Sequence, residues 1–458
     1  MKKMKIRYKL LACLTALVLL VGCSGCAMEK EKAEQIPEQT DSLVVYAGPY
    51  TAKFLNMAVK LFSIIYPDIN VEVRDFGDYS DYQNQQNYME VLKSELAAGT
   101  GPDLILFTPV DFEDIQKTAG SGAFQNISGY IENDAGFSLE NYNSGVMEAG
   151  VYNGQRLFVP ISYSINLFLT TEETLNKESW KLPSDLQELY SQMTEFGQLY
   201  RSNTERFFSH YPLYSFLLES SGIPVADWIS KEIKVDDEAF RDFMSAYKEL
   251  YSIDWKRYEE GIYVKDPNYT YTGDTVKLIR NNKIQYIFES YHPSLLSDYA
   301  ALLNDQTPVY AAFPSLSGKP VATIDMAAAV NRNGANKANA YNLLKIMLSE
   351  KMQTYGSENF CLYYDIPVLD GVYKKLLEEQ NRKYAGGGTP DGSIRYALIP
   401  DDTINSFVSL VSDVTCSNIS PQVQSFVWEE MKSYFEDQKS YEQCLESLRN
   451  KLELYINE

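Results

Sequence analysis

The stretch from Leu92 to Phe107, LKSELAAGTGPDLILF, constrains the fold more than any other part of the chain. Its first half continues a helical stripe of apolar residues that starts at Tyr88. Gly99 and Gly101 end that helix, because glycine adopts positive φ at little cost and the proline after them cannot continue a helix. The apolar run after Asp103 has the length of a strand buried on both faces. The stretch therefore predicts a helix, a tight turn and a parallel strand, whose carboxyl end is where ligands bind in an open α/β sheet.

The segments around this stretch extend the same pattern. An apolar strand at Leu43–Tyr46 precedes a helix that Pro67 stops, and Ile69–Phe76 alternates like a second strand. This β-α-β-α-β order predicts a parallel sheet. Further on, Val151–Pro160 predicts a hairpin that turns at Asn153-Gly154. The next strand, Ile161–Leu169, is expected to leave this first lobe for a second one, because 458 residues exceed one ordinary domain.

Composition limits the classes of partner. Hydrophobic residues make up 45% of the chain and charged residues 22%, as in globular proteins. The net charge of −21 does not suit nucleic acid, whose phosphates require clustered Lys and Arg, so we expect no nucleic acid partner. The 35 tyrosines outnumber the 25 glycines. Tyrosine suits a sugar site, since its ring stacks on C–H surfaces while its hydroxyl forms hydrogen bonds.

The amino terminus has the pattern of a secretion signal over residues 1–22. Basic residues come first, and the apolar stretch Leu10–Leu20 is shorter than the roughly 20 residues of a membrane span. The tetrapeptide that ends at Cys23, LVGC, resembles the bacterial lipobox, which implies that Cys23 is acylated and begins the mature chain. Cys26 is a weaker alternative, and an uncleaved anchor is another. Residues 23–41 are polar and predict an unfolded tether.

Three cysteines lie in the body of the chain, at Cys361, Cys416 and Cys444. They show neither CxxC nor zinc spacing, so we expect buried free thiols. A Cys416–Cys444 bridge stays open, because sequence alone does not show proximity.

Motifs for catalysis, metals and cofactors are missing from the sequence. It has two histidines and no HExxH, GxSxG or Walker A pattern. The glycine-rich segment 386–392 lacks the Lys-Ser/Thr of a nucleotide loop and predicts a flexible loop. Asp75, Asp78 and Asp81 do not have EF-hand spacing. We therefore assign no catalytic residue, metal or cofactor, although a pair of carboxylates for glycoside hydrolysis requires only proximity in space.

The segment AAGTGPDL closely resembles the "AAGxxPDL" turn of bacterial extracellular solute-binding proteins of the sugar-binding type, family 1. Further matches follow in the family's order and run from the lipobox to the carboxyl terminus. They lie at Gly120–Ile131, Val151–Pro160, Val309–Pro320, Ala327–Glu350, Ile366–Val368 and Ser440–Leu448. The resemblance implies an α/β, two-lobe fold of the periplasmic-binding-protein type (type II), with a hinge of crossing segments.

The same resemblance implies that the protein binds a solute and catalyses no reaction. A monomer, held by its lipid on the extracytoplasmic face of the cell membrane, would deliver a small-molecule solute, expected to be a carbohydrate, to the permease subunits of an ABC importer. Closure of the lobes on the solute would report occupancy to the permease. The alternatives are another solute in the same fold, such as a peptide, polyamine or metal chelate, an extracellular hydrolase, or a sensor without transport.

The lobe boundaries follow from the resemblance as well. The first lobe would hold residues 42–163 and 314–350, and the second would hold 168–309 and 355–458. Three crossings would then lie near Ser164–Leu167, Val309–Phe313 and Glu350–Tyr355.

The ligand-facing candidates lie at the ends of strands and at the crossings. Family positions carry stacking aromatics near Phe107 and Tyr291 and a carboxylate near Asp111, and Glu289 would add a second carboxylate. At the first crossing, maltose-type proteins can carry an acid where this chain has Ser164, which leaves the class of sugar open. The candidates are Tyr50, Phe107, Asp111 and Tyr163 in the first lobe and Tyr211, Tyr214, Glu289, Tyr291 and Gln424 in the second.

Overall fold

The structure is a computed structural model that describes residues 41–458 with short gaps. The gaps are 113, 201–213, 261–275, 278, 281–286, 291–292, 359–364, 389–391, 393 and 418. The part from Pro37 onward forms one compact unit, which is described here by itself. Cys23 and the tether lie outside the described residues.

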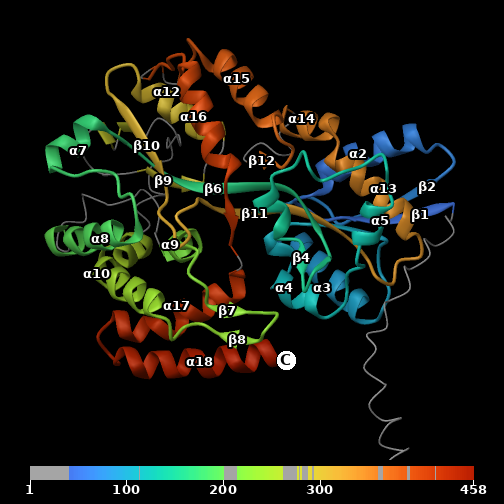
Figure 1. Cartoon of the computed structure of the whole chain (residues 1–458), viewed down its shortest axis with the longest axis horizontal. Coiled ribbons are helices and arrows are strands. Elements are labelled where there is room, and N and C mark those ends of the chain that lie inside the picture. Colours follow the sequence, from blue (N-terminus) through green and yellow to red (C-terminus); the bar gives the residue numbers. More distant parts are fainter. Residues whose placement is uncertain are drawn as a thin grey trace, which may run out of the picture. The chain divides into compact units, whose positions relative to one another are not determined.

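A sheet of nine strands organises the described residues (Figure 1). The main order is β10-β6-β11-β3-β1-β2, with β9 and β12 also paired to β6 and β13 paired to β11. The strands are β1 (Ser42–Ala47), β2 (Asn70–Asp75), β3 (Leu104–Phe107), β6 (Val159–Thr171), β9 (Ile287–Ser290), β10 (Pro308–Ala312), β11 (Val321–Val330), β12 (Ile366–Pro367) and β13 (Thr415–Cys416).

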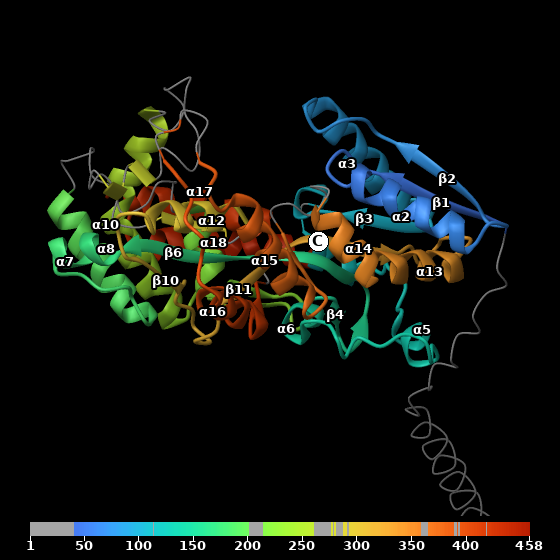
Figure 2. The same cartoon turned by 90° about the horizontal axis from the view of Figure 1, so that it is seen from above.

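The parallel part of the sheet confirms the predicted β-α-β-α-β order. β1 pairs in parallel with both β2 and β3. Its two faces are covered by different helices, because successive side chains of a strand point to opposite faces. Leu43 and Val45 pack in the main core with α2 and α13, whereas Tyr46 packs in a second cluster with α3. The helices are α2 (Ala52–Ile65), α3 (Tyr82–Ala97) and α13 (Lys337–Leu348) (Figure 2).

The turn between α3 and β3 has the predicted glycine geometry. Gly99 and Gly101 have φ of +72° and +102°, where a side chain would be strained. Asp103 then accepts hydrogen bonds from the backbone N–H groups of Val44 and Asn336, both at 2.8 Å. One buried carboxylate thus ties β3 to β1 and to the start of α13.

Two long strands, β6 and β11, join the parallel part to the rest of the sheet. All 13 residues of β6 are buried. The first half of β6 pairs with β11, and its second half pairs with β9 and β10. β11 also pairs antiparallel with β3. Figure 1 shows β6 and β11 running between the elements around β1 and those around α8.

The remaining elements pack around these strands, and many of them are helices. The hairpin β4–β5 turns at Asn153 and Gly154, with φ of +50° and +73°, as predicted. The elements are η1 (Pro109–Asp111, a 3₁₀ helix), α4 (Ile115–Gly120), α5 (Ser128–Glu132), α6 (Ser144–Glu148), β4 (Val151–Tyr152), β5 (Gln155–Arg156), α7 (Glu172–Glu178), α8 (Leu186–Tyr200), α9 (Tyr214–Ser221), β7 (Ala226–Asp227), β8 (Glu232–Ile233), α10 (Glu238–Glu260), α12 (Pro293–Leu302), α14 (Glu350–Glu358), α15 (Val372–Tyr384), α16 (Asp401–Ser412), α17 (Pro421–Phe435) and α18 (Tyr441–Asn457).

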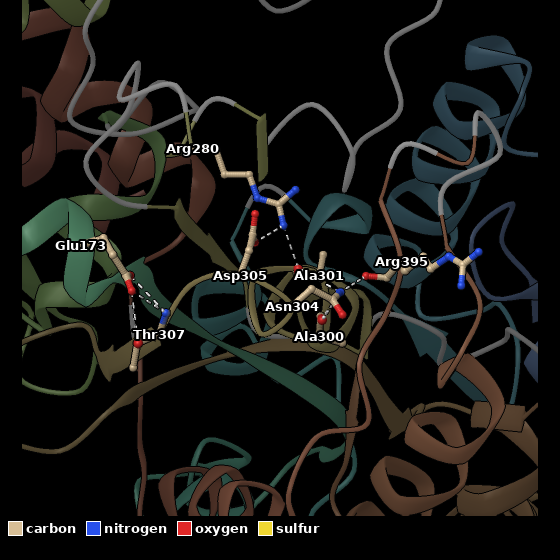
Figure 3. A network of polar contacts seen from close by, with 8 residues as sticks. All are labelled: Glu173, Arg280, Ala300, Ala301, Asn304, Asp305, Thr307 and Arg395. Carbon is tan, nitrogen blue, oxygen red and sulfur yellow. Dashed lines mark hydrogen bonds and ion pairs between the residues drawn. The ribbon is translucent and has the colours of Figure 1, made fainter.

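A polar network closes the carboxyl end of α12 and the loop into β10 (Figure 3). The Arg280 guanidinium donates to the Ala301 carbonyl at 3.0 Å and to Asp305 at 2.5 Å. The last carbonyls of a helix lack partners within it, and a cation there also favours the helix dipole. Glu173 accepts hydrogen bonds from the N–H and the hydroxyl of Thr307. The network therefore fixes the entry into β10.

Two of the three body cysteines can be assigned. Cys416 and Cys444 are free thiols, so the predicted free state is confirmed for both and the alternative bridge does not form. Burial raises the pKa of the Cys416 thiol to about 12. Cys361 lies outside the described residues. In the described part of the chain, no helix combines the length and the apolar character required to cross a membrane.

Close packing of α8 on α10 leads to a prediction. A methyl group on Gly197 would lie 2.4 Å from the Glu249 carbonyl oxygen. We expect Gly197→Ala to lower the free energy of unfolding, because overpacking costs about 1–3 kcal/mol and outweighs the roughly 1 kcal/mol gain in helix propensity. The measurement is the urea midpoint. The control is Gly129→Ala in α5, where the methyl group meets open space and stability should not fall.

Candidate functional site

A cavity of about 190 Å³ lies at the carboxyl end of β3, where ligands bind in an open α/β sheet. Its walls come from segments far apart in the sequence: β3 with η1, α4, the residue before β6, α9, β11 and the start of α17. The lining residues are Phe107, Thr108, Pro109, Phe112, Ile115, Gln116, Ala149, Phe158, Glu219, Thr323, Ile324, Ala327, Ser417, Ile419, Ser420, Pro421 and Gln424.

One wall of the cavity is aromatic. Phe107 is buried, with its ring centroid 5.1 Å from that of Phe112 and 5.9 Å from that of Phe158, in edge-on contacts. Phe112 is only partly buried. Phe107 therefore supports the wall from behind, and Phe112 is the ring best placed to pack against the C–H surface of a ligand.

The turn η1 positions this aromatic wall. Asp111 Oδ2 accepts hydrogen bonds from the Thr108 N–H at 2.6 Å and from its hydroxyl at 3.0 Å, and Asp111 Oδ1 accepts one from Gln85 at 2.7 Å. Burial raises the pKa of Asp111 and these hydrogen bonds partly offset that rise. Asp111 thus holds the turn that presents Thr108, Pro109 and Phe112 to the cavity.

Another part of the lining carries Glu219, the single ionisable side chain among the described lining residues. It comes from α9 and accepts a hydrogen bond from the Thr323 hydroxyl on β11 at 2.8 Å. Burial raises the pKa of Glu219 to about 7, and the bond from Thr323 lowers it only in part. The cavity therefore has an apolar side and an acidic side.

A stripe of polar residues on β6 runs beside Glu219. Ser162, Ser164 and Asn166 are all buried and, two residues apart, share one face of the strand. The Ser162 hydroxyl donates to Asp365 at 2.7 Å, and the Asn166 amide donates to Ser220 at 2.6 Å.

Ser164, in the middle of the stripe, donates to Asp325 Oδ1 at 3.1 Å. Asp325 stands at a bulge in β11: Ile324 pairs with Tyr163 and Met326 pairs with Ser162, so Asp325 has no opposite residue. Such bulges redirect a side chain. The other carboxylate oxygen, Oδ2, is buried without a hydrogen-bond partner in the described part of the chain. Burial raises the pKa of Asp325 well above its usual range, and the charges of Asp365 and Glu219 add to the rise.

Contacts from α4 to the last two helices lie near the cavity. The side chain of Ser420, the N-cap of α17, lies close to Asp114, the N-cap of α4, and it partly offsets the rise in the pKa of Asp114 that burial causes. The Lys117 ammonium donates to the Tyr455 carbonyl in α18 at 3.1 Å and lies 4.1 Å from the centroid of the same tyrosine's ring. These contacts join α4 to α17 and α18, and of these helices α4 and α17 line the cavity.

Two of the sequence candidates, Phe107 and Gln424, line the cavity. Tyr50 does not: it is 51% exposed and stacks on Tyr79. Asp111 lines a neighbouring cavity of about 520 Å³ that also contains Phe112 and Lys117. The structure therefore separates Tyr50 and Asp111 from the cavity where Phe107 lies.

Tyr163 is buried and points away from the polar stripe, since it alternates with Ser162 and Ser164. Its hydroxyl donates to the Val411 carbonyl at 2.9 Å and accepts from Asn143. It does not line the cavity.

The other candidates are described partly or not at all. Tyr211 and Tyr291 lie outside the described residues. Tyr214 begins α9, and Glu289 pairs with Leu167 through β9, but nothing is described of either side chain.

Sequence reasoning missed Glu219, Phe112 and Asp325. The alternation of Ser162, Ser164 and Asn166 in an otherwise apolar strand was a usable signal, because polar residues at period 2 in a buried strand need polar partners. Glu219 gave no such signal, since an acid after apolar residues within a helix, as in α9, is often an exposed residue. Among the described residues, no group of three or more His, Cys, Asp or Glu side chains is arranged to hold a metal ion.

The family described as bacterial extracellular solute-binding protein matches residues 66–383 of the chain. No curated protein sequence matches it significantly.

Several solved structures share the fold at low sequence identity. The sugar-binding protein MalE from Xanthomonas citri is 12% identical with a TM-score of 0.62, over 91% of this chain and 97% of that one. The cyclic alpha-maltosyl-1,6-maltose binding protein from Arthrobacter globiformis is 13% identical with a TM-score of 0.58, over 91% and 98%. An ABC substrate-binding protein from Listeria monocytogenes in complex with cycloalternan is 14% identical with a TM-score of 0.53, over 91% and 99%. The predicted α/β fold of the two-lobe periplasmic type is thereby confirmed.

Glu219 leads to a prediction on stability. Between pH 4.5 and about 7, the unfolded chain has lost the Glu219 proton while the folded chain keeps it. We therefore expect the free energy of unfolding to fall as the pH rises through this window, by on the order of 3 kcal/mol at about 1.4 kcal/mol per pKa unit. Glu219→Gln should remove this slope in urea unfolding across the window. Glu72→Gln, at an exposed carboxylate, should keep it. An unchanged slope in Glu219→Gln would assign the titration to another group, such as Asp325, whose pKa burial also raises.

Proposed function

The chain belongs to the bacterial extracellular solute-binding proteins, and we propose that it is lipid-anchored and delivers a carbohydrate to an ABC importer. Proteins of this family bind small-molecule solutes extracytoplasmically and work with ABC transporters, and the family and its structural neighbours are binding proteins rather than enzymes. The carbohydrate, the lipid anchor, the monomeric state and transport rather than sensing belong to the proposal.

The proposal of a carbohydrate ligand rests on the cavity beside Phe112. A sugar ring has apolar C–H faces and a rim of hydroxyls. The cavity offers an aromatic wall for the faces, and Thr323, Ser417 and Gln424 among its polar groups for the rim. Its volume of about 190 Å³ is below the roughly 300–1,000 Å³ usual for drug-sized ligands, which favours a small sugar or one end of a longer one.

The hinge follows from the same arrangement. We assign residues 42–163 and 314–350 to one lobe and 168–309 and 355–458 to the other. β6 and β11 then cross between the lobes beside the cavity, and opening would be a rotation about these paired strands. Contacts such as that of Lys117 with Tyr455 would break on opening.

The nine candidates from the sequence differ in their place in the proposed site. Phe107 and Gln424 stay in it as wall residues, and Phe112 and Glu219 join it. Tyr211, Tyr214, Glu289 and Tyr291 remain proposals, because the hinge would bring the α9 and β9 regions toward the same cleft.

A sugar panel tests the function. We expect at least one mono- or oligosaccharide to raise the melting temperature and to be recovered unchanged, because a ligand that binds only the folded state stabilises it. Phe112→Ala should weaken that binding by about 1–2 kcal/mol, five- to thirty-fold, in calorimetry. The control is Tyr82→Ala, at an exposed ring outside the cavity. Hydrolysis of the sugar, or equal affinities for wild type and Phe112→Ala, would contradict the proposal.

The anchor is tested separately at Cys23. We expect Cys23→Ala to release the protein into the medium or to leave an unprocessed precursor, because the thiol is the atom that the lipid modifies. Cys26→Ala is the matched control and should be processed normally. The measurement is metabolic labelling with a fatty acid, together with the mass of the mature chain. Lipid retained on Cys23→Ala would move the anchor to another residue.

A further inference from the structure

Every polar group that lines the described part of the cavity is neutral except Glu219. The hydroxyls and amides of Thr323, Ser417 and Gln424 would serve a neutral sugar. We call the side of the cavity that carries Glu219 the acidic pole. A carboxylate at a mostly apolar surface is costly in free energy unless a positive charge or several hydrogen bonds compensate it. Thr323 supplies one hydrogen bond.

Asp325 lies next to Glu219 on the same face of the sheet. Thr323, which binds Glu219, pairs directly with Ser164, which binds Asp325. Burial and then the charge of Asp365 raise the pKa of Asp325, and the charge of Glu219 adds to the rise. Asp325 Oδ2 is buried and accepts no hydrogen bond from the described residues. The bulge in β11 thus brings a second carboxylate, with an unused oxygen, to the pole that Glu219 forms.

Neither carboxylate has an ion-pair partner among the described residues. The described ion pairs of lysine and arginine all involve other acids: Glu95, Asp134, Glu188, Glu232, Asp236, Asp305, Glu350, Glu378, Asp413, Glu429, Glu430, Glu436, Asp437, Glu442 and Glu458. Glu219 and Asp325 are both half-buried, and two neighbouring carboxylates shielded from water do not readily both ionise without a cation. The raised pKa of Glu219, about 7, agrees with the lack of a positively charged partner among the described residues.

We propose that the solute carries a protonated amine, which Glu219 binds at the cavity wall and Asp325 supports from behind. The inference rests on the proposed function and specifies its solute as an amino sugar. The ammonium would donate charge-assisted hydrogen bonds to the acidic pole while the C–H face of the ring packs on Phe112. A neutral sugar would fill the same space but would leave the negative charge of the pole uncompensated.

The test compares sugars that differ only in charge, with the full-length chain purified in detergent. D-Glucosamine and D-galactosamine are titrated against D-glucose, D-galactose and N-acetyl-D-glucosamine by calorimetry, with spermidine as an amine without a ring. We expect one amino sugar to bind at least ten-fold more tightly than its neutral counterparts. Glu219→Gln should reduce that preference to less than two-fold, and Asp325→Asn should reduce it in part.

The control for the lost charge is Glu72→Gln, an exposed acid outside the cavity, which should keep the full preference. Equal affinity for an amino sugar and its neutral counterpart overturns the inference and leaves the sugar-binding function standing. Binding of spermidine, but of no sugar, would support amine binding at the acidic pole and would contradict a carbohydrate as the solute. A preference that survives in folded Glu219→Gln places the amine elsewhere and overturns the inference. No binding by any probe overturns the inference, and the panel of mono- and oligosaccharides then decides the sugar-binding function separately.

Discussion

The antiparallel pairing of β6 with β11 is the constraint on which the rest of the structure depends. Both strands are paired on each side, β11 with β3 and β6 also with β9 and β10, so the parallel part of the sheet and the helical part share one continuous hydrogen-bonded path. A side chain on these strands is fixed relative to both parts. The polar stripe on β6 and the carboxylate of Asp325 therefore lie where the two parts of the sheet meet. A change in the angle between these parts would alter the contacts of these side chains.

The cavity combines two kinds of wall with different energetics. The aromatic cluster around Phe107 is apolar and packed edge-on, which stabilises the fold whether or not the cavity is filled. The acidic side around Glu219 is costly without a compensating charge, as its raised pKa shows. In the proposed site, the apolar half would therefore support the fold and the acidic half would select among solutes.

Sequence reasoning predicted the parallel part of the fold well, because its signals are local. The glycines after α3, the apolar runs of β1 and β3, and the Asn153-Gly154 turn each determine their own backbone geometry. The site was harder, because it depends on contacts between distant segments. Asp111 has a position that fits a ligand contact, yet its oxygens hold the η1 turn, and Tyr163 shares a strand with the stripe but faces the other way. Glu219 could not be predicted from the sequence, because its place depends on how α9 packs against Thr323 of β11.

The contact between Lys117 and Tyr455 has a practical consequence for handling the protein. The carbonyl and the ring that hold Lys117 belong to the last turn of α18, three residues before the final residue of this sequence, Glu458. Lys117 also lies 3.9 Å from the Glu458 carboxylate. An affinity tag or reporter fused at that end would therefore start within reach of a contact between α4 and α18, whose residues Lys117 and Tyr455 both line the neighbouring cavity of about 520 Å³. Fusions of this kind are better placed on an exposed loop, so that a fluorophore reports the motion of the walls without altering it.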